Sequence, residues 1–182
     1  LYHKEFTGEI PSDEEIEQDE NLVGLIKGGA TSEYKPEFYT AEDDLGLVSK
    51  DILTKEEGLI KSGIMTLNGN KLAALTPTAR VSTSEDGKRR IVKIGGATNN
   101  NGKKYVIRFL HEDKEDGNIR LTIVGKNEAG WSLAFAKDKE TVVDAEFKAK
   151  PHDKEGTLII YDEEITGETT AATNETEATA EA

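Results

Sequence analysis

The sequence predicts a mainly β protein: an antiparallel β-sandwich or barrel with one short flanking helix and extended arms. Two observations carry this prediction. Short apolar runs that alternate with polar residues recur along residues 89–164, and a period of two is typical of strands. The breaks between these runs combine Gly with Asn or Asp, the residues that reverse a strand within a short turn: SEDGK, NNNGK, EDGN, NEAG and DKEG.

Composition limits the classes of function. The chain has 182 residues, 35% of them hydrophobic, which suits one domain with a modest core. Its 36 acidic and 23 basic side chains give a net charge of −13, which does not favour tight binding to nucleic-acid phosphates. With no cysteine there is no disulfide, no thiolate zinc site and no cysteine nucleophile. No apolar run approaches the roughly 20 residues of a membrane-spanning helix.

The first third of the chain predicts an arm, strands and a long loop. Residues 1–20 are acidic and poorly patterned, so we predict an N-terminal arm outside the core. Apolar runs within residues 21–40 predict one or two strands. Residues 41–58 mix charges with isolated apolar residues and have no steady period, so we predict a long loop with a functional role. Strand character returns at 59–68, and residues 69–76 predict the one short helix, ended by a proline.

The remainder predicts strands over residues 89–96, 104–112, 118–126, 130–136, 142–150 and 156–164. In the second of these, Arg108 lies between Val106 and Leu110 on one face, so this face is too mixed for plain solvent surface. We predict core anchors at three apolar positions of the fourth strand: Trp131, Leu133 and Phe135. Residues 166–182 contain only Thr, Ala, Glu, Gly and Asn, and predict a disordered acidic tail.

No pattern predicts a catalytic, metal or cofactor site. The three histidines are far apart in the sequence, and EDKEDGN does not follow the spacing of a helix-loop-helix calcium loop. We interpret this acidic stretch as the turn between two strands. The basic stretch GKRR, with Lys93, either protects a sheet edge or holds an acidic partner.

A family resemblance covers residues 24–165. It rests on the order of four phrases: GLIKGGATSEYKPEF, KEEGLIKSGIMTLNGNKLAAL, RRIVKIGG and the long stretch from KKYVIRFLHE to GTLIIYDEEI. In this order they resemble the major tail tube protein of long-tailed bacteriophages of Gram-positive hosts. The acidic tail after Thr166 departs from the family pattern.

The resemblance implies a structural, non-enzymatic virion protein without cofactor. Six copies would close into a ring, and rings would stack into the hollow tail tube through which phage DNA passes into the host without specific binding. The implied partners are further copies of the chain, the tape measure protein, the tail terminator and the distal tail proteins. The implied location is the virion tail, assembled in the host cytoplasm. Residues 41–58 match the position of the family's inter-ring loop, and residues 1–20 match its N-terminal arm.

Candidate contacts between subunits, or with the lumen, are charged side chains on the strands and in the expected loop: Arg108, Arg120, Glu42, Asp43, Asp44, Lys50 and Asp51. Two other classes of function stay open. One is a monomeric immunoglobulin-like or β-sandwich module that binds or decorates a phage particle. The other is a calcium-dependent or hydrolytic enzyme.

Overall fold

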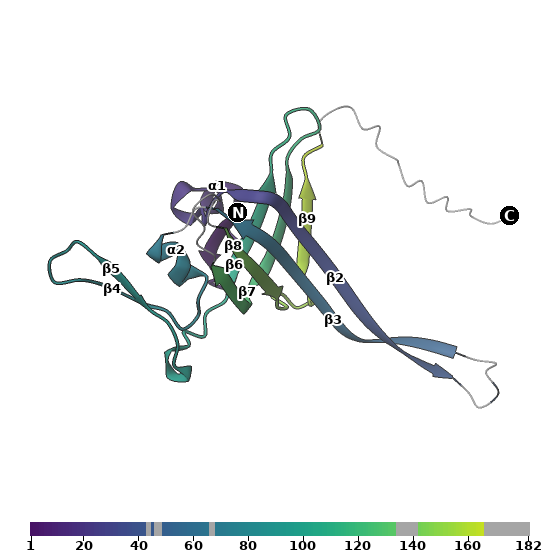
Figure 1. Cartoon of the computed structure of the whole chain (residues 1–182). Coiled ribbons are helices and arrows are strands. Elements are labelled where there is room, and N and C mark those ends of the chain that lie inside the picture. Colours follow the sequence, from purple (N-terminus) through teal and green to yellow (C-terminus); the bar gives the residue numbers. More distant parts are fainter. Residues whose placement is uncertain (43–44, 46–48, 66–67, 134–141, 166–182) are drawn as a thin grey trace.

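The structure is a computed structural model that describes residues 1–42, 45, 49–65, 68–133 and 142–165 (Figure 1). These residues are mainly β, with antiparallel sheets and short helices, which confirms the predicted class and is consistent with a sandwich-like architecture. The elements are β1 (Tyr2–Glu5), α1 (Asp13–Ile16), η1 (Asp19–Asn21), β2 (Ile26–Glu42), β3 (Ser49–Ile64), α2 (Gly69–Ala74), β4 (Arg80–Thr83), β5 (Arg90–Lys93), η2 (Ala97–Asn99), β6 (Tyr105–His111), β7 (Ile119–Leu133), β8 (Val143–Ala149) and β9 (Ile159–Glu163).

The main sheet has seven strands in the described part of the chain. Its order is β1-β6-β7-β8-β3-β2, with β9 paired to β7. Strand β7 organises the sheet, because Gly125 pairs with Tyr105 of β6 on one edge and with Ala149 of β8 on the other. Strand β9 pairs with residues 119–123, so β9 and β8 occupy successive stretches of the same edge of β7.

One face of this sheet forms the main core. Ile60, Ile107, Ile123 and Phe147, which come from four different strands, are fully buried in one cluster. Leu75, which follows α2, is also buried there. Burial of large aliphatic and aromatic side chains supplies about 1.5–3 kcal/mol each, so this face accounts for much of the stability of the sheet.

The N-terminal segment belongs to the fold, which corrects the prediction that residues 1–20 are an arm outside the core. Strand β1 pairs with β6 along its whole length. The chain then crosses the second face of β6 and β7, where Ile16 is fully buried with Val106 and Val124. The burial of Ile16 could not be predicted from the sequence, because a single isoleucine among acidic residues gives no apolar period.

The prediction of a loop over residues 41–58 is wrong at both ends, since residues 41–42 belong to β2 and residues 49–58 belong to β3. Strands β2 and β3 form a long antiparallel hairpin that projects from the body of the protein (Figure 1). Every residue of β3 from Ser49 to Glu56 is exposed. With both faces of the strand exposed, no alternation of apolar and polar residues marks it in the sequence.

A bulge also joins two predicted strands into one. The strands expected at 118–126 and 130–136 are the single strand β7, which continues to Leu133. Gly130 has a positive φ of 79°, and the register shifts between Asn127 and Trp131. Glycine here supports a bulge, which bends a strand, and not the reversal that the sequence suggested. Of the predicted core anchors, Trp131 and Leu133 are half-buried, and Phe135 lies outside the described residues.

Other predicted elements are confirmed with shorter bounds. Strands β5, β6, β8 and β9 lie within the expected ranges. The predicted helix is α2, and it begins where the Asn68 side chain accepts hydrogen bonds from the backbone N–H groups of Asn70 and Lys71. Helix α1 is a second short helix that the sequence did not predict. The expected acidic tail, residues 166–182, lies outside the described residues.

Gly125 is required by a close approach of two backbones. A Cβ atom at this position would lie 2.0 Å from the carbonyl oxygen of Lys148. We expect Gly125→Ala to lower the free energy of unfolding by about 3 kcal/mol or more, measured by urea denaturation. Gly87→Ala is the control, since its Cβ would meet nothing within 4 Å and only the positive φ of 70° is strained. It should cost about 1 kcal/mol; equal losses in the two variants would contradict the steric explanation.

Candidate functional site

The acidic stretch between β6 and β7 is a turn, as predicted. The Asp113 carboxylate accepts hydrogen bonds from the backbone N–H groups of Asp116 (3.0 Å) and Glu115 (2.8 Å). These bonds hold the pKa of Asp113 below its ordinary value. Among the described residues, no group of three histidine and carboxylate side chains is placed to hold a metal ion.

Arg108 and Arg120 lie beneath the N-terminal segment, with only 7% and 11% of their side chains exposed. Arg108 donates through Nε to Thr122 Oγ1 at 3.0 Å and pairs with Asp13 of α1. Arg120 donates through Nε to Glu17 Oε1 at 2.8 Å. Both guanidinium groups are therefore paired inside the chain.

The C-terminal end of the described sheet completes this cluster. Glu164, which follows β9, accepts a hydrogen bond from Arg120 Nη1 at 2.6 Å. That bond is the largest of the effects that lower the pKa of Glu164, and the hydrogen bonds from Arg120 to Glu17 and Glu164 raise the pKa of the guanidinium further. The buried arginine cluster, defined as Asp13, Glu17, Arg108, Arg120 and Glu164, thus ties the N-terminal segment and the end of β9 to β6 and β7.

This geometry corrects the prediction that Arg108 and Arg120 face a neighbouring subunit or the lumen. Charge reversal at either arginine would place a new carboxylate beside Asp13 and Glu17 in this nearly buried cluster, so it would act on the fold of each subunit. Sequence alternation placed both arginines on the second face of the sheet. It could not show that acidic residues about 100 positions away in the sequence cover that face.

The other predicted contact residues lie on the projecting hairpin. Glu42 ends β2 opposite Ser49, the first residue of β3, and Lys50 and Asp51 follow Ser49. All three predicted residues are exposed. Asp51 accepts a hydrogen bond from Thr40 Oγ1 at 2.6 Å across the hairpin. Asp43 and Asp44 lie outside the described residues. The structure therefore brings together the described residues of this group at one end of the hairpin, away from the arginine cluster.

The sequence did not predict a surface of exposed apolar side chains on this hairpin. Phe38 and Tyr39 of β2 and Ile52 and Leu53 of β3 are exposed by 61%, 60%, 43% and 45%. We name these four side chains the distal apolar surface. Ile52 and Leu53 lie among charged residues in the stretch predicted as a long functional loop, whereas Phe38 and Tyr39 lie in the stretch predicted as strand.

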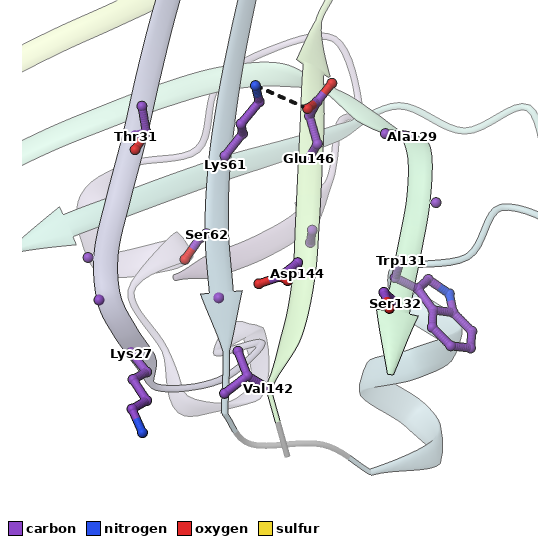
Figure 2. Close-up of a pocket in the computed structure, with 15 residues that line it drawn as sticks. Lys27, Thr31, Lys61, Ser62, Ala129, Trp131, Ser132, Val142, Asp144 and Glu146 are labelled. Atoms are coloured by element: carbon purple, nitrogen blue, oxygen red, sulfur yellow. Dashed lines mark ion pairs between the residues drawn. The ribbon is translucent and has the colours of Figure 1, made fainter. Parts of the chain in front are cut away.

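An open groove of about 730 Å³ lies between two bulged strands (Figure 2). Gly28 and Gly29 of β2 line one side, and Gly130 and Trp131 of β7 line the other. Lys61 crosses the floor and pairs with Glu33 (3.1 Å) and Glu146 (3.4 Å). Its described lining contains no histidine beside a serine or carboxylate, which is the arrangement that activates a nucleophile.

Ser62 on the floor of the groove is 6% exposed, and its hydroxyl has no hydrogen-bond partner among the described residues. A buried unpaired hydroxyl costs about 1–3 kcal/mol. The groove is thus an open surface of mixed polar and apolar lining, with one unpaired hydroxyl on its floor.

No protein-family model and no curated protein sequence matches the chain. Membership of the tail tube family therefore remains a prediction from the sequence resemblance. None of the helices in the described residues is long and apolar enough to cross a membrane.

We expect Glu17→Gln to destabilise the protein by about 3 kcal/mol, because it removes the carboxylate that both buried arginines share. Urea denaturation of the purified protein measures this change. Glu5→Gln is the matched control, since it breaks an exposed ion pair with Lys103 and should leave the denaturation midpoint almost unchanged. A similar loss in both variants would mean that the cluster does not fix the N-terminal segment.

His3 makes the stability of the same segment depend on pH. Its ring stacks on Tyr105 with centroids 4.2 Å apart, and burial lowers its pKa from 6.5 to about 4. Since the unfolded chain binds the proton more tightly, stability is full above pH 6.5 and falls toward pH 4. Between pH 6.5 and 5 we expect a loss of roughly 1–2 kcal/mol in the free energy of unfolding. His3→Phe keeps the stacked ring and should abolish the loss; an unchanged slope would refute this origin.

Proposed function

We propose that this protein is the major tail tube subunit of a bacteriophage. Copies associate head to tail into hexameric rings, and rings stack into a hollow tube through which phage DNA passes into the host. The sequence resemblance supports this proposal, and the observation that carries it is the distal apolar surface of hairpin β2–β3. The subunit acts as a structural component of the virion tail and not as an enzyme.

The distal apolar surface has two faces. In the register of the hairpin, Phe38 lies opposite Leu53 and Tyr39 lies opposite Ile52. Consecutive residues of a strand point to opposite faces, so each face carries one aromatic and one aliphatic side chain. Exposed apolar surface on a soluble protein marks contacts with other proteins. A hairpin with apolar side chains on both faces suits a position between two neighbouring copies.

The projecting hairpin also needs support from outside. A two-stranded hairpin alone in water has marginal stability, and hydrophobic packing against other elements is what stabilises it. Residues of β3 near the body, such as Ile60 and Ile64, have this packing. Residues from Ser49 to Glu56 are all exposed in the described chain. Assembly supplies the missing contacts.

Strand β2 offers a second means of association. It lies at the end of the strand order, so one of its edges has no neighbouring strand in the described sheet. The unpaired N–H and C=O groups of an edge strand are a template for pairing with another chain. When head-to-tail contacts of this kind close, they form a ring.

The charge of the chain fits the passage of DNA. A ring of subunits that each carry −13 repels phosphates overall, so DNA would pass through the bore without binding tightly. The ends of such a tube would meet the tape measure, tail terminator and distal tail proteins that the resemblance implies.

We expect the double variant Phe38→Ser/Leu53→Ser to abolish rings and tubes while the subunit remains folded, because it removes the apolar pair from one face. Negative-stain microscopy and sedimentation velocity measure assembly, and circular dichroism checks the fold. Tyr161→Ser is the control, since Tyr161 is 56% exposed on β9 and is not part of the distal apolar surface. It should assemble normally.

A wild-type protein that stays monomeric at all concentrations and temperatures would refute this function. That result would favour the monomeric binding or decoration module.

A further inference from the structure

Hairpin β4–β5 concentrates basic side chains that have no partner in the chain. Between Arg80 and Ile94 the sequence has five basic and two acidic residues, a net charge of 5 − 2 = +3, whereas the whole chain carries −13. None of the five basic side chains makes an ion pair or a side-chain hydrogen bond in the described structure: Arg80, Lys88, Arg89, Arg90 and Lys93. Lysines of the main sheet behave differently, since Lys55 and Lys148 both contact Glu57.

The register of the hairpin places like charges together. Arg80 lies directly opposite Lys93, and like charges at directly opposite positions repel each other. Ile91 shares their face, because it lies two residues before Lys93, and it is exposed. The opposite face is turned to α2, where Gly69 contacts the side chains of Arg90 and Val92. The outward face, defined by Arg80, Ile91 and Lys93, is therefore basic, partly apolar and uncovered.

The N-terminal segment offers a surface of opposite charge. Asp13 and Glu17 point to the arginine cluster and hold the segment on β6 and β7. Glu5 pairs with Lys103. The other carboxylates of this segment are exposed and make no ion pair in the described structure: Glu9, Glu14, Glu15, Asp19 and Glu20. Since the inner carboxylates fix the segment, its five exposed and unpaired carboxylates concentrate negative charge there, as many charges as the hairpin has cations.

We propose that hairpin β4–β5 of one copy docks on the outer acidic side of the N-terminal segment of a second copy. This inference rests on the proposed self-assembly and assigns it a second contact, separate from the β2–β3 hairpin. The β4–β5 hairpin projects well away from the main sheet, so it is placed to reach another molecule (Figure 1). Charge complementarity between two surfaces of one chain favours head-to-tail association, since the surfaces differ.

The test is a charge exchange between two triple variants. The hairpin variant is Lys88→Glu/Arg89→Glu/Lys93→Glu, and the acidic-segment variant is Glu9→Lys/Glu14→Lys/Glu20→Lys. Alone, each should raise the protein concentration needed for assembly at least about tenfold, because like charges then meet at the contact. An equimolar mixture should assemble like the wild type, since each reversed surface meets a reversed partner. Circular dichroism checks that both variants fold.

The matched control reverses three other unpaired lysines, Lys104→Glu/Lys114→Glu/Lys154→Glu, and thus changes the net charge equally. It should assemble normally. If this control fails as the hairpin variant does, or if the mixture of the two triple variants does not recover, net charge and not a specific contact governs assembly, and the inference is wrong. Normal rings from the hairpin variant alone would also overturn it while leaving the proposed function intact.

A crosslinking experiment tests the contact without requiring tubes. The chain has no cysteine, so Lys88→Cys and Glu14→Cys each introduce a single thiol. Oxidation of the two mixed proteins should give a disulfide-linked heterodimer in preference to either homodimer. Absence of that product would overturn the inference, and its presence without rings would separate this contact from the tube.

DNA is the competing occupant of the basic hairpin. A labelled DNA duplex should show no binding to wild-type protein by fluorescence anisotropy at physiological salt. Binding that the hairpin variant loses, together with normal assembly of that variant, would assign the hairpin to nucleic acid instead.

Discussion

The fold depends on how the two arginines on the second face of β6 and β7 are covered. Arg108 and Arg120 are nearly buried, and a buried cation is tolerated only when carboxylates and hydrogen bonds compensate for its lost hydration. Asp13 and Glu17 supply that compensation from the N-terminal segment, and Glu164 supplies it from the end of β9. A face that is too mixed in the sequence for plain solvent surface thereby becomes an interior.

This arrangement divides the acidic residues of the N-terminal segment into two groups with different roles. Carboxylates that point inward neutralise the arginines and fix the N-terminal segment. Those that point outward keep their charge exposed. An acidic run in the sequence is usually interpreted as solvated, and for most of its members, though not for Asp13 and Glu17, that interpretation is correct. The segment can present a rigid anionic surface because its inner side is anchored.

The sequence predicted the elements whose two faces differ and missed those whose faces are alike. Strand β8 has one buried face, so its alternation was visible and its bounds were nearly correct. The outer part of β3 has two exposed faces, and its pairing with β2 comes from register and not from apolar pattern. The partners of Arg108 could not be predicted, because Asp13 is 95 residues away in the sequence and only the fold brings them together.

The two projecting hairpins each expose side chains that are unfavourable in the single chain, and the physical reason differs between them. The β2–β3 hairpin exposes apolar side chains that water solvates poorly, and the β4–β5 hairpin exposes like charges that repel each other. The apolar side chains of the β2–β3 hairpin are covered by any close-fitting apolar contact, so this hairpin supplies affinity with little selectivity. The like charges of the β4–β5 hairpin are neutralised only by an anionic surface at a fixed place, so this hairpin selects orientation and register. A subunit that must repeat one contact many times needs both, because affinity alone permits open aggregates whereas complementary charges restrict association to one geometry.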